Sequence, residues 1–181
     1  MKHPIATTLC LTLIGTAGLI GAQPVMAADQ TAAMHKTTPE GIGDSIGTIA
    51  VANSAAGATF KLDLHGLPPG PHGFHVHENG NCDPTLMNGV RMPAGAAGSH
   101  MDPDHTSKHE GPTGTGHMGD LPALDVASNG TATQSLTAPR IKDASILKKH
   151  ALIIHAGGDN YSDAPAALGG GGGRLACGVI E

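Results

Sequence analysis

The alternation of apolar and polar residues predicts a chain made mainly of short β-strands. Residues 59–65 alternate strictly, so that every second side chain can face a core. Residues 45–53 alternate less regularly, and the small residues that separate the two segments are typical of a turn. The two segments therefore predict a half-buried β-hairpin. Residues 34–38 are expected to form an edge strand before it, ending at the turn signal Pro39-Glu40-Gly41.

The later strands are expected around two long irregular stretches. In residues 73–78, two histidines alternate with the apolar Phe74 and Val76. Asn129-Gly130 is a strong turn signal between two apolar segments, which predicts a second hairpin. The remaining predicted elements are strands at 123–127, 131–137, 151–155 and 174–180, and a short helical or turn segment at 145–150.

No segment has the periodicity of an amphipathic helix, so the pattern predicts an all-β fold. We expect a Greek-key antiparallel β-sandwich or flattened barrel, immunoglobulin-like in architecture, with two long functional loops. The composition agrees, because the chain has 27 glycines but no tryptophan, one tyrosine and two phenylalanines. No internal repeat or linker divides the chain, and residues 28–181 are expected to form one domain.

The first 27 residues have the features of a cleaved export signal. Lys2 provides a basic start, and an apolar run spans residues 9–20. Small residues of the kind that a signal peptidase recognises end at Ala27. The apolar run is too short for a transmembrane helix. We therefore expect an exported protein without membrane contact after cleavage.

Charge and cysteine content narrow the class of partner. The formal net charge is −5 and the chain has no basic cluster, which argues against nucleic acid as a partner. Without the export signal, only Cys82 and Cys177 remain. Two cysteines in an exported chain favour one disulfide over two free thiols or a pair of metal ligands.

Histidines at ligand-like spacing indicate a first metal site within residues 71–121, which hold seven of the 12 histidines. His75 and His77 point to the same side of a predicted strand, about 6–7 Å apart along the backbone, which suits two imidazoles on one ion. His155 ends a separate apolar strand and can join them. Imidazole nitrogens in a near-planar arrangement suit copper(II); the alternative is a pair of surface histidines.

A second set of possible ligands follows in the glycine-rich part of the same stretch. Its members are His100, His109, His117 and Asp120. Three imidazoles and one carboxylate match a tetrahedral zinc site without an open position, so the zinc is expected to be structural rather than catalytic. Such a site would organise a loop that has no core of its own. The alternative is that these are ordinary loop histidines.

Two segments resemble the signature sequences of the copper/zinc superoxide dismutases. They are GFHVH at 73–77 and GGRLACGVI at 172–180. Residues 98–103, 108–112 and 117–122 resemble the zinc loop of that family, and residues 152–160 resemble its next conserved block. The resemblance covers nearly all of the mature chain in order. With the export signal, the chain is most similar to the bacterial periplasmic branch, so the protein is expected in the periplasm.

The resemblance implies one copper and one zinc ion per subunit and a role for each ligand. The implied copper ligands are His75, His77, His100 and His155. The implied zinc ligands are His100, His109, His117 and Asp120, so that His100 bridges the two ions. The resemblance further implies that Asp159 accepts hydrogen bonds from a histidine of each set, His75 and His109, and that Cys82 and Cys177 form the family disulfide.

The implied reaction is the disproportionation of superoxide to dioxygen and hydrogen peroxide, with copper alternating between copper(II) and copper(I). Arg174 matches the arginine beside copper, where its guanidinium is expected to hold the superoxide anion. On reduction His100 is expected to leave copper and take a proton. Because the protein is net negative, any steering of the anion must be local. The candidate guiding cations are Arg91, which we favour, and Lys108, Lys148 and Lys149.

Two other functions are compatible with parts of this pattern. A non-enzymatic periplasmic copper/zinc-binding protein on the same fold would need neither Arg174 nor a complete bridging set. A zinc hydrolase would be active without copper. Residues 79–97 have no close match in the animal enzymes, so both a monomer and a homodimer are open. His72 is expected to be a loop or strand-edge side chain rather than a ligand, and His105 is also left out of the ligand sets.

Overall fold

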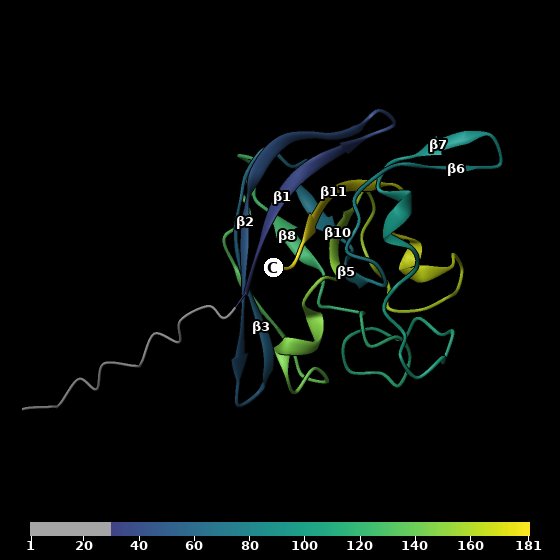
Figure 1. Cartoon of the computed structure of the whole chain (residues 1–181). Coiled ribbons are helices and arrows are strands. Elements are labelled where there is room, and N and C mark those ends of the chain that lie inside the picture. The colour runs from purple at the N-terminus through teal and green to yellow at the C-terminus, as the bar shows by residue number, and fades with distance from the viewer. Residues whose placement is uncertain (1–29) are drawn as a thin grey trace, which may run out of the picture.

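The computed structural model describes residues 30–181, so the predicted export signal lies outside the described residues. Seven strands form one antiparallel sheet in the order β5-β10-β11-β1-β2-β3-β9 (Figure 1). They are β1 (Gln30–Thr38), β2 (Gly41–Ser54), β3 (Gly57–Leu64), β5 (Phe74–His77), β9 (Ser135–Ala138), β10 (Ala151–His155) and β11 (Arg174–Val179). No helix among the described residues is long and apolar enough to cross a membrane.

Two short strand pairs and three 3-10 helices complete the architecture. The pairs are β4 (Gly70–His72) with β8 (Leu124–Val126), and β6 (Thr85–Met87) with β7 (Val90–Met92). The helices are Gly95–Ala97, Ala144–Leu147 and Leu168–Gly170. β4 continues almost directly into β5 at one edge of the large sheet, whereas β8 leads to β9 at the opposite edge. The β4–β8 pair therefore links the two edges, and the sheet curls into the predicted flattened barrel with Greek-key connections.

The predicted alternation of β3 produces the centre of the core. Phe60, Leu62 and Leu64 are each at most 1% exposed. The ring of Phe60 packs edge-to-face on Phe74 of β5, with 5.8 Å between the ring centroids. Because Phe74 faces this core, the two histidines of β5 must point to the other side of the strand. That side is also covered, since all four residues of β5 are buried.

Two predictions about strand pairing are wrong. The first strand is not an edge strand, because β1 begins earlier than expected and lies between β11 and β2. The segments around Asn129-Gly130 form the predicted turn, with the Ala127 amide donating to the Thr131 carbonyl (2.8 Å). They do not form a hairpin, however, because β8 pairs with β4 and β9 pairs with β3. A turn signal is local, whereas pairing depends on which sheet edges offer free backbone groups.

The long stretch after β5 contains a hairpin that the sequence analysis missed. β6 and β7 are joined by Asn88 and Gly89, whose φ angles are 52° and 79°. Positive φ at both central residues is the two-residue turn that suits a hairpin. Asn88-Gly89 is the same kind of turn signal as Asn129-Gly130, so the sequence does indicate this hairpin. The hairpin projects from the body of the protein (Figure 1).

Candidate metal centre

The outer side of β5 is where the two long loops bring buried polar side chains together. Backbone hydrogen bonds hold the first loop there, because the Val76 amide donates to Gly119 O and Val76 O accepts from the Met101 amide (both 2.9 Å). These contacts form isolated bridges that place His100 beside His77 and Asp120 beside His75. The strand and the loop thus present their ligand-type side chains to one another.

The first cluster of four histidines comes from β5, the loop and the end of β10. Its members are His75, His77, His100 and His155, all buried, with one nitrogen from each lying within 4.8 Å of the others. All four rings have their second nitrogen held by the protein, and that of His100, Nδ1, lies 3.0 Å from Asp120 Oδ1. His75 Nε2 lies 2.8 Å from Asp159, His77 Nδ1 lies 3.0 Å from Gly98 O, and His155 Nδ1 lies 3.3 Å from Gly172 O. Contacts of this kind orient a metal ligand.

The inward nitrogens of the cluster have no hydrogen-bond partner among the described residues. These buried atoms are His75 Nδ1 and the Nε2 atoms of His77, His100 and His155. A buried polar atom without a partner costs free energy, so four such atoms around one point indicate a ligand. The donor set is all imidazole, which suits copper. The residues present therefore fit a copper ion.

Burial also keeps these imidazoles neutral. It lowers the pKa of His100 to about 4 and that of His155 to about 3, with nearby positive charge adding to the effect. Burial likewise holds the pKa of His77 well below its usual value, and that of His75 below it. A neutral imidazole has a free lone pair, the form that binds a metal ion. The centre is therefore ready to bind a metal at neutral pH.

The second cluster surrounds one carboxylate oxygen, Asp120 Oδ1. The Nδ1 atoms of His100 and His109 each lie 3.0 Å from it, and His117 Nδ1 lies 3.4 Å away. The Nδ1 atoms of His109 and His117 approach this oxygen without hydrogen-bond geometry, and both are buried. The other oxygen of Asp120 accepts from the Glu110 and Gly111 amides (3.1 and 3.2 Å). Three imidazoles and one oriented carboxylate fit a tetrahedral zinc ion.

The second cluster differs from the first because contacts between its acidic and histidine side chains outweigh the effect of burial on the pKa values of Asp120 and His109. Burial alone would raise the pKa of Asp120, but contacts with His100 and His109 lower it well below its usual range. Burial would lower the pKa of His109, but Asp120 and Asp159 outweigh it and raise this pKa to about 9. His75 also lies within 4.8 Å of the ligand atoms of His100, His109 and Asp120. Its ring stacks on that of His100 at 3.9 Å between centroids, so the two clusters are in direct contact.

Asp159 lies between the two clusters and contacts one histidine of each. Its Oδ2 is 2.8 Å from His75 Nε2, and its Oδ1 is 2.8 Å from His109 Nε2. The Tyr161 amide also donates to it (2.7 Å). Burial would raise the pKa of Asp159, but the contacts with His109 and His75 lower it, so the carboxylate is charged at neutral pH.

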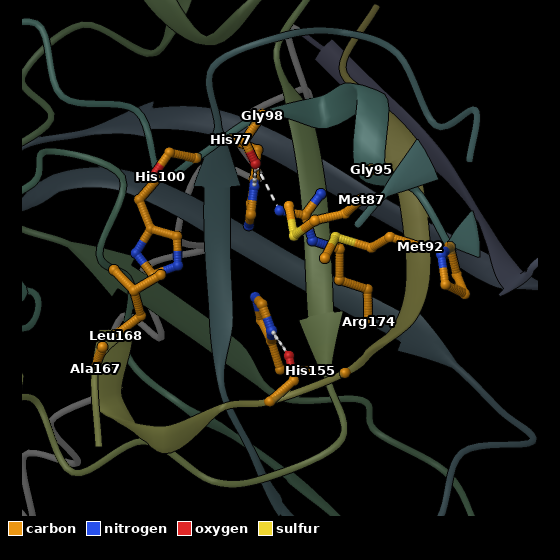
Figure 2. Close-up of a pocket in the computed structure, with 14 residues that line it drawn as sticks. His77, Met87, Met92, Gly95, Gly98, His100, His155, Ala167, Leu168 and Arg174 are labelled. Atoms are coloured by element: carbon orange, nitrogen blue, oxygen red, sulfur yellow. Dashed lines mark hydrogen bonds between the residues drawn. The ribbon is translucent and has the colours of Figure 1, made fainter. Parts of the chain in front are cut away.

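Arg174 lies at the mouth of the first cluster. It begins β11 directly opposite His155 of β10, beside a register shift. Its guanidinium donates to Ala94 O (2.5 Å) and Gly98 O (2.6 Å), which fixes the side chain against the loop after β7. Figure 2 shows Arg174 with His77, His100 and His155 around one pocket, whose volume is about 590 Å³. Among the described residues that line it, Arg174 is the only one with a permanent positive charge.

The predicted disulfide between Cys82 and Cys177 is confirmed. The bond joins the start of the loop to β11, with 5.8 Å between the Cα atoms. Both half-cystines are buried against Ala94 and Ala97. The disulfide and the Arg174 contacts therefore fasten the same loop to the same strand.

The structure does not bring the favoured guiding cation to the pocket. Arg91 is exposed, and its Nε donates to Pro39 O (2.6 Å). Lys108, Lys148 and Lys149 do not line the pocket either. His72 of β4 is buried, and its ring nitrogens lie 2.7 Å from His155 O and 2.8 Å from Pro68 O.

Several residues that support the site carry no signal in the sequence. Arg140 donates to the carbonyls of Gly116 and His117 (both 2.9 Å), which fixes a ligand of the second cluster. The contact spans more than twenty residues, so no local pattern predicts it. Met87 and Met92 line the pocket, and the missed Asn-Gly turn would have placed both on one face of a hairpin.

Comparisons with known sequences agree with this geometry. The profile of the family described as copper/zinc superoxide dismutase (SODC) matches residues 45–180. The Cu-Zn superoxide dismutase 2 of Salmonella typhimurium is 49% identical over 173 residues, covering 96% of this chain and 98% of the relative.

Comparisons with solved structures point the same way. The Cu/Zn superoxide dismutase from Brucella abortus superposes with a TM-score of 0.83 at 47% identity, covering 84% of this chain and 100% of the other. The solution structure of the monomeric copper, zinc superoxide dismutase from Salmonella enterica gives a TM-score of 0.75 at 52% identity, covering 83% and 98%. Both are immunoglobulin-like β-folds, in agreement with the predicted fold class.

Proposed function

Because this chain belongs to the copper/zinc superoxide dismutase family, we propose a role for each residue of the metal centre. The enzyme converts two superoxide anions and two protons into dioxygen and hydrogen peroxide, and its cofactors are copper and zinc. The relatives support this activity rather than a non-enzymatic metal carrier.

The first cluster, His75, His77, His100 and His155, would hold one copper ion per subunit. His100, His109, His117 and Asp120 would hold one zinc ion. The observation that carries both assignments is the set of six buried histidine nitrogens that have no hydrogen-bond partner within residues 30–181. His75 has one such nitrogen, which can serve one ion only, and we assign it to copper. His117 then completes the zinc set through Nδ1, which lies near the shared Asp120 oxygen.

His100 belongs to both sets through different nitrogens. Its Nδ1 faces Asp120 (3.0 Å) and its Nε2 is buried among the other copper ligands. Copper supplies a one-electron redox couple when bound, and zinc supplies a positive charge without redox chemistry. We assign His100 Nε2 as the atom that holds a proton for the peroxide product. Asp120 and the zinc set keep the ring oriented meanwhile.

Arg174 binds the substrate anion at the pocket mouth. A guanidinium has five N–H donors, and the contacts with Ala94 O and Gly98 O use only part of them. The remaining donors can face a small oxyanion in the pocket. Since no other permanent cation of the described residues lines the pocket, Arg174 supplies the local attraction that an acidic protein needs.

Residues 28–181 form the mature protein in the periplasm, after removal of residues 1–27. The signal-like sequence and the bacterial relatives support this proposal. Of the monomer and homodimer that the sequence left open, we favour the monomer, because the Salmonella enterica relative, 52% identical, is described as monomeric. Light scattering of the purified mature protein tests the oligomeric state, and amino-terminal sequencing tests the cleavage site.

The decisive test is direct observation of superoxide decay with defined metal content. Protein with copper and zinc should accelerate the decay, whereas copper-depleted protein that retains zinc should not. Full activity with zinc alone would contradict the copper assignment and favour zinc chemistry. Elemental analysis and the visible copper(II) spectrum, measured on the same samples, identify which ion each preparation carries.

A further inference from the structure

Met87 and Met92 line the pocket, unlike the other methionines of the described residues. In the part of the chain that the structure describes, Met34 and Met101 are buried in the core, and Met118 packs against it. Met87 is 52% exposed, and Met87 and Met92 both line the pocket that leads to His77 and His155. Met87 therefore contributes little to the core, and what distinguishes the pair is that both line this pocket.

The register of the β6–β7 hairpin places both thioethers on one face. Thr85 pairs with Met92, and Met87 pairs with Val90, so these four side chains share a face. Met87 and Met92 are diagonal neighbours there, within reach of long side chains. Figure 2 shows both sulfur atoms directed into the pocket, on the side of Arg174. Leu86 and Arg91 occupy the opposite face of the same hairpin.

Thioether sulfur is a soft, uncharged ligand that selects copper(I) over zinc and other hard cations. It carries no proton at neutral pH, so it binds and releases an ion without acid–base chemistry. Methionine side chains are also flexible, which allows two sulfurs to close on one ion. Two sulfurs at the exposed mouth offer fewer ligand atoms than the four buried imidazoles of His75, His77, His100 and His155, so an ion taken up at the mouth would move inward to that histidine cluster.

We propose that Met87 and Met92 form an entry site that takes up copper(I) at the pocket mouth and passes it to the buried histidines. The transfer exchanges sulfur ligands for imidazole nitrogens and leaves the oxidation state of copper unchanged. The transfer of copper(I) to the histidines rests on the copper ligands proposed above, whereas the binding of copper(I) by the two sulfurs does not.

Binding is tested on the mature protein with both metals bound, its copper reduced to copper(I) and its disulfide intact. The methionine methyl groups are labelled with ¹³C. Copper(I) is added without oxygen, and the methyl resonances are assigned with single Met→Leu variants. The resonances of Met87 and Met92 should shift together, while those of Met34 and Met101 stay in place. If neither resonance moves with excess copper(I), or only one does, a two-thioether site is excluded.

Delivery is tested by the rate at which copper enters zinc-loaded, copper-free protein from a coloured copper(I)–chelator complex. The double variant Met87→Leu with Met92→Leu keeps the size and apolar character of both side chains. It should load roughly tenfold more slowly, because the soft ligands are gone, yet reach the same final copper content. Adding Leu86→Met to this variant returns a thioether to the wrong face of the hairpin and should not restore the rate.

Equal loading rates in the wild type and the double variant would overturn the proposal, and so would rescue by Leu86→Met. Neither experiment measures dismutation. The entry site can therefore fail while the dismutase function stands, and a protein that loads copper normally but does not consume superoxide would contradict the proposed function alone.

Discussion

The carboxylate of Asp159 lies 2.8 Å from Nε2 of His75, a residue 84 positions earlier in the chain. Its second oxygen makes an equally short contact with His109, so one side chain orients a ligand of each proposed metal. Asp159 lies in the loop between β10 and β11, whereas His75 belongs to β5 and His109 to the first long loop. The two loops are therefore coupled through a residue that belongs to neither proposed ligand set.

Replacing Asp159 with asparagine should weaken zinc binding. An amide presents one acceptor oxygen and an NH₂ group, so it cannot accept from both His75 and His109. We expect zinc affinity to fall roughly ten- to a hundredfold, the usual cost of losing such a supporting contact. Competition with a chromophoric zinc chelator measures this affinity. Asp125→Asn, an exposed acid on β8, is the matched control and should bind zinc normally.

Arg174→Ala should keep both metals and lose most of the activity. A hydrogen bond to a charged group contributes about 1.5–3 kcal/mol, so the rate constant for superoxide decay should fall roughly ten- to a hundredfold. Arg174→Lys retains the charge but not the guanidinium fork, so its rate constant should lie between those of the wild type and Arg174→Ala. The control is Arg91→Ala, because that side chain binds Pro39 O away from the pocket. Comparable losses in the Arg174 and Arg91 variants would argue against a specific role for Arg174.

Arg140→Met should release zinc faster. The substitution removes both donors to the carbonyls of Gly116 and His117, and leaves these acceptors without a partner from that side chain. We expect a cost of about 1–3 kcal/mol, expressed as freer movement of His117 and faster loss of zinc to a chelator. Lys142→Met, an exposed neighbour, controls for the change in charge. An unchanged zinc release rate would show that His117 is held without Arg140.

The metal-free protein should lose stability as the pH falls from about 6.5 toward 4. In the unfolded chain a histidine titrates near 6.5. Burial keeps the pKa of His100 at about 4 and that of His155 at about 3 in the folded state. Below 6.5 the unfolded chain therefore binds protons that the folded chain does not, which costs up to about 1.4 kcal/mol per pH unit for each histidine.

His109 does not oppose this trend. Its pKa is raised to about 9, so its contribution to stability is complete below pH 6.5 and is lost only as the pH rises toward 9. Urea unfolding between pH 7 and 4.5 measures how steeply the free energy of unfolding depends on pH. His155→Gln should reduce this slope by the contribution of one histidine. A free energy of unfolding that stays constant over this range would contradict the buried, neutral state of these histidines.

Local patterns in the sequence were sufficient for most elements and for the chemistry of the site. The strict alternation of residues 59–65 predicted β3, and the spacing of His75 and His77 placed both on the outer side of β5, because the period of a strand is fixed at two. Ligand type followed from residue type, since imidazoles and carboxylates suit copper and zinc whatever the fold. The family resemblance then supplied the full ligand sets, the disulfide and Arg174.

Only the tertiary structure decided which segments are neighbours. It placed β1 inside the sheet and sent β8 and β9 to different partners, because pairing depends on free edges elsewhere in the fold. It directed Arg91 to Pro39 and gave Arg140 a role at His117, contacts that span more than twenty residues. It also placed Met87 and Met92 in the same pocket as His77, His100 and His155. The sequence determines which chemistry each side chain can perform, and the packing of distant segments determines which side chains meet to perform it.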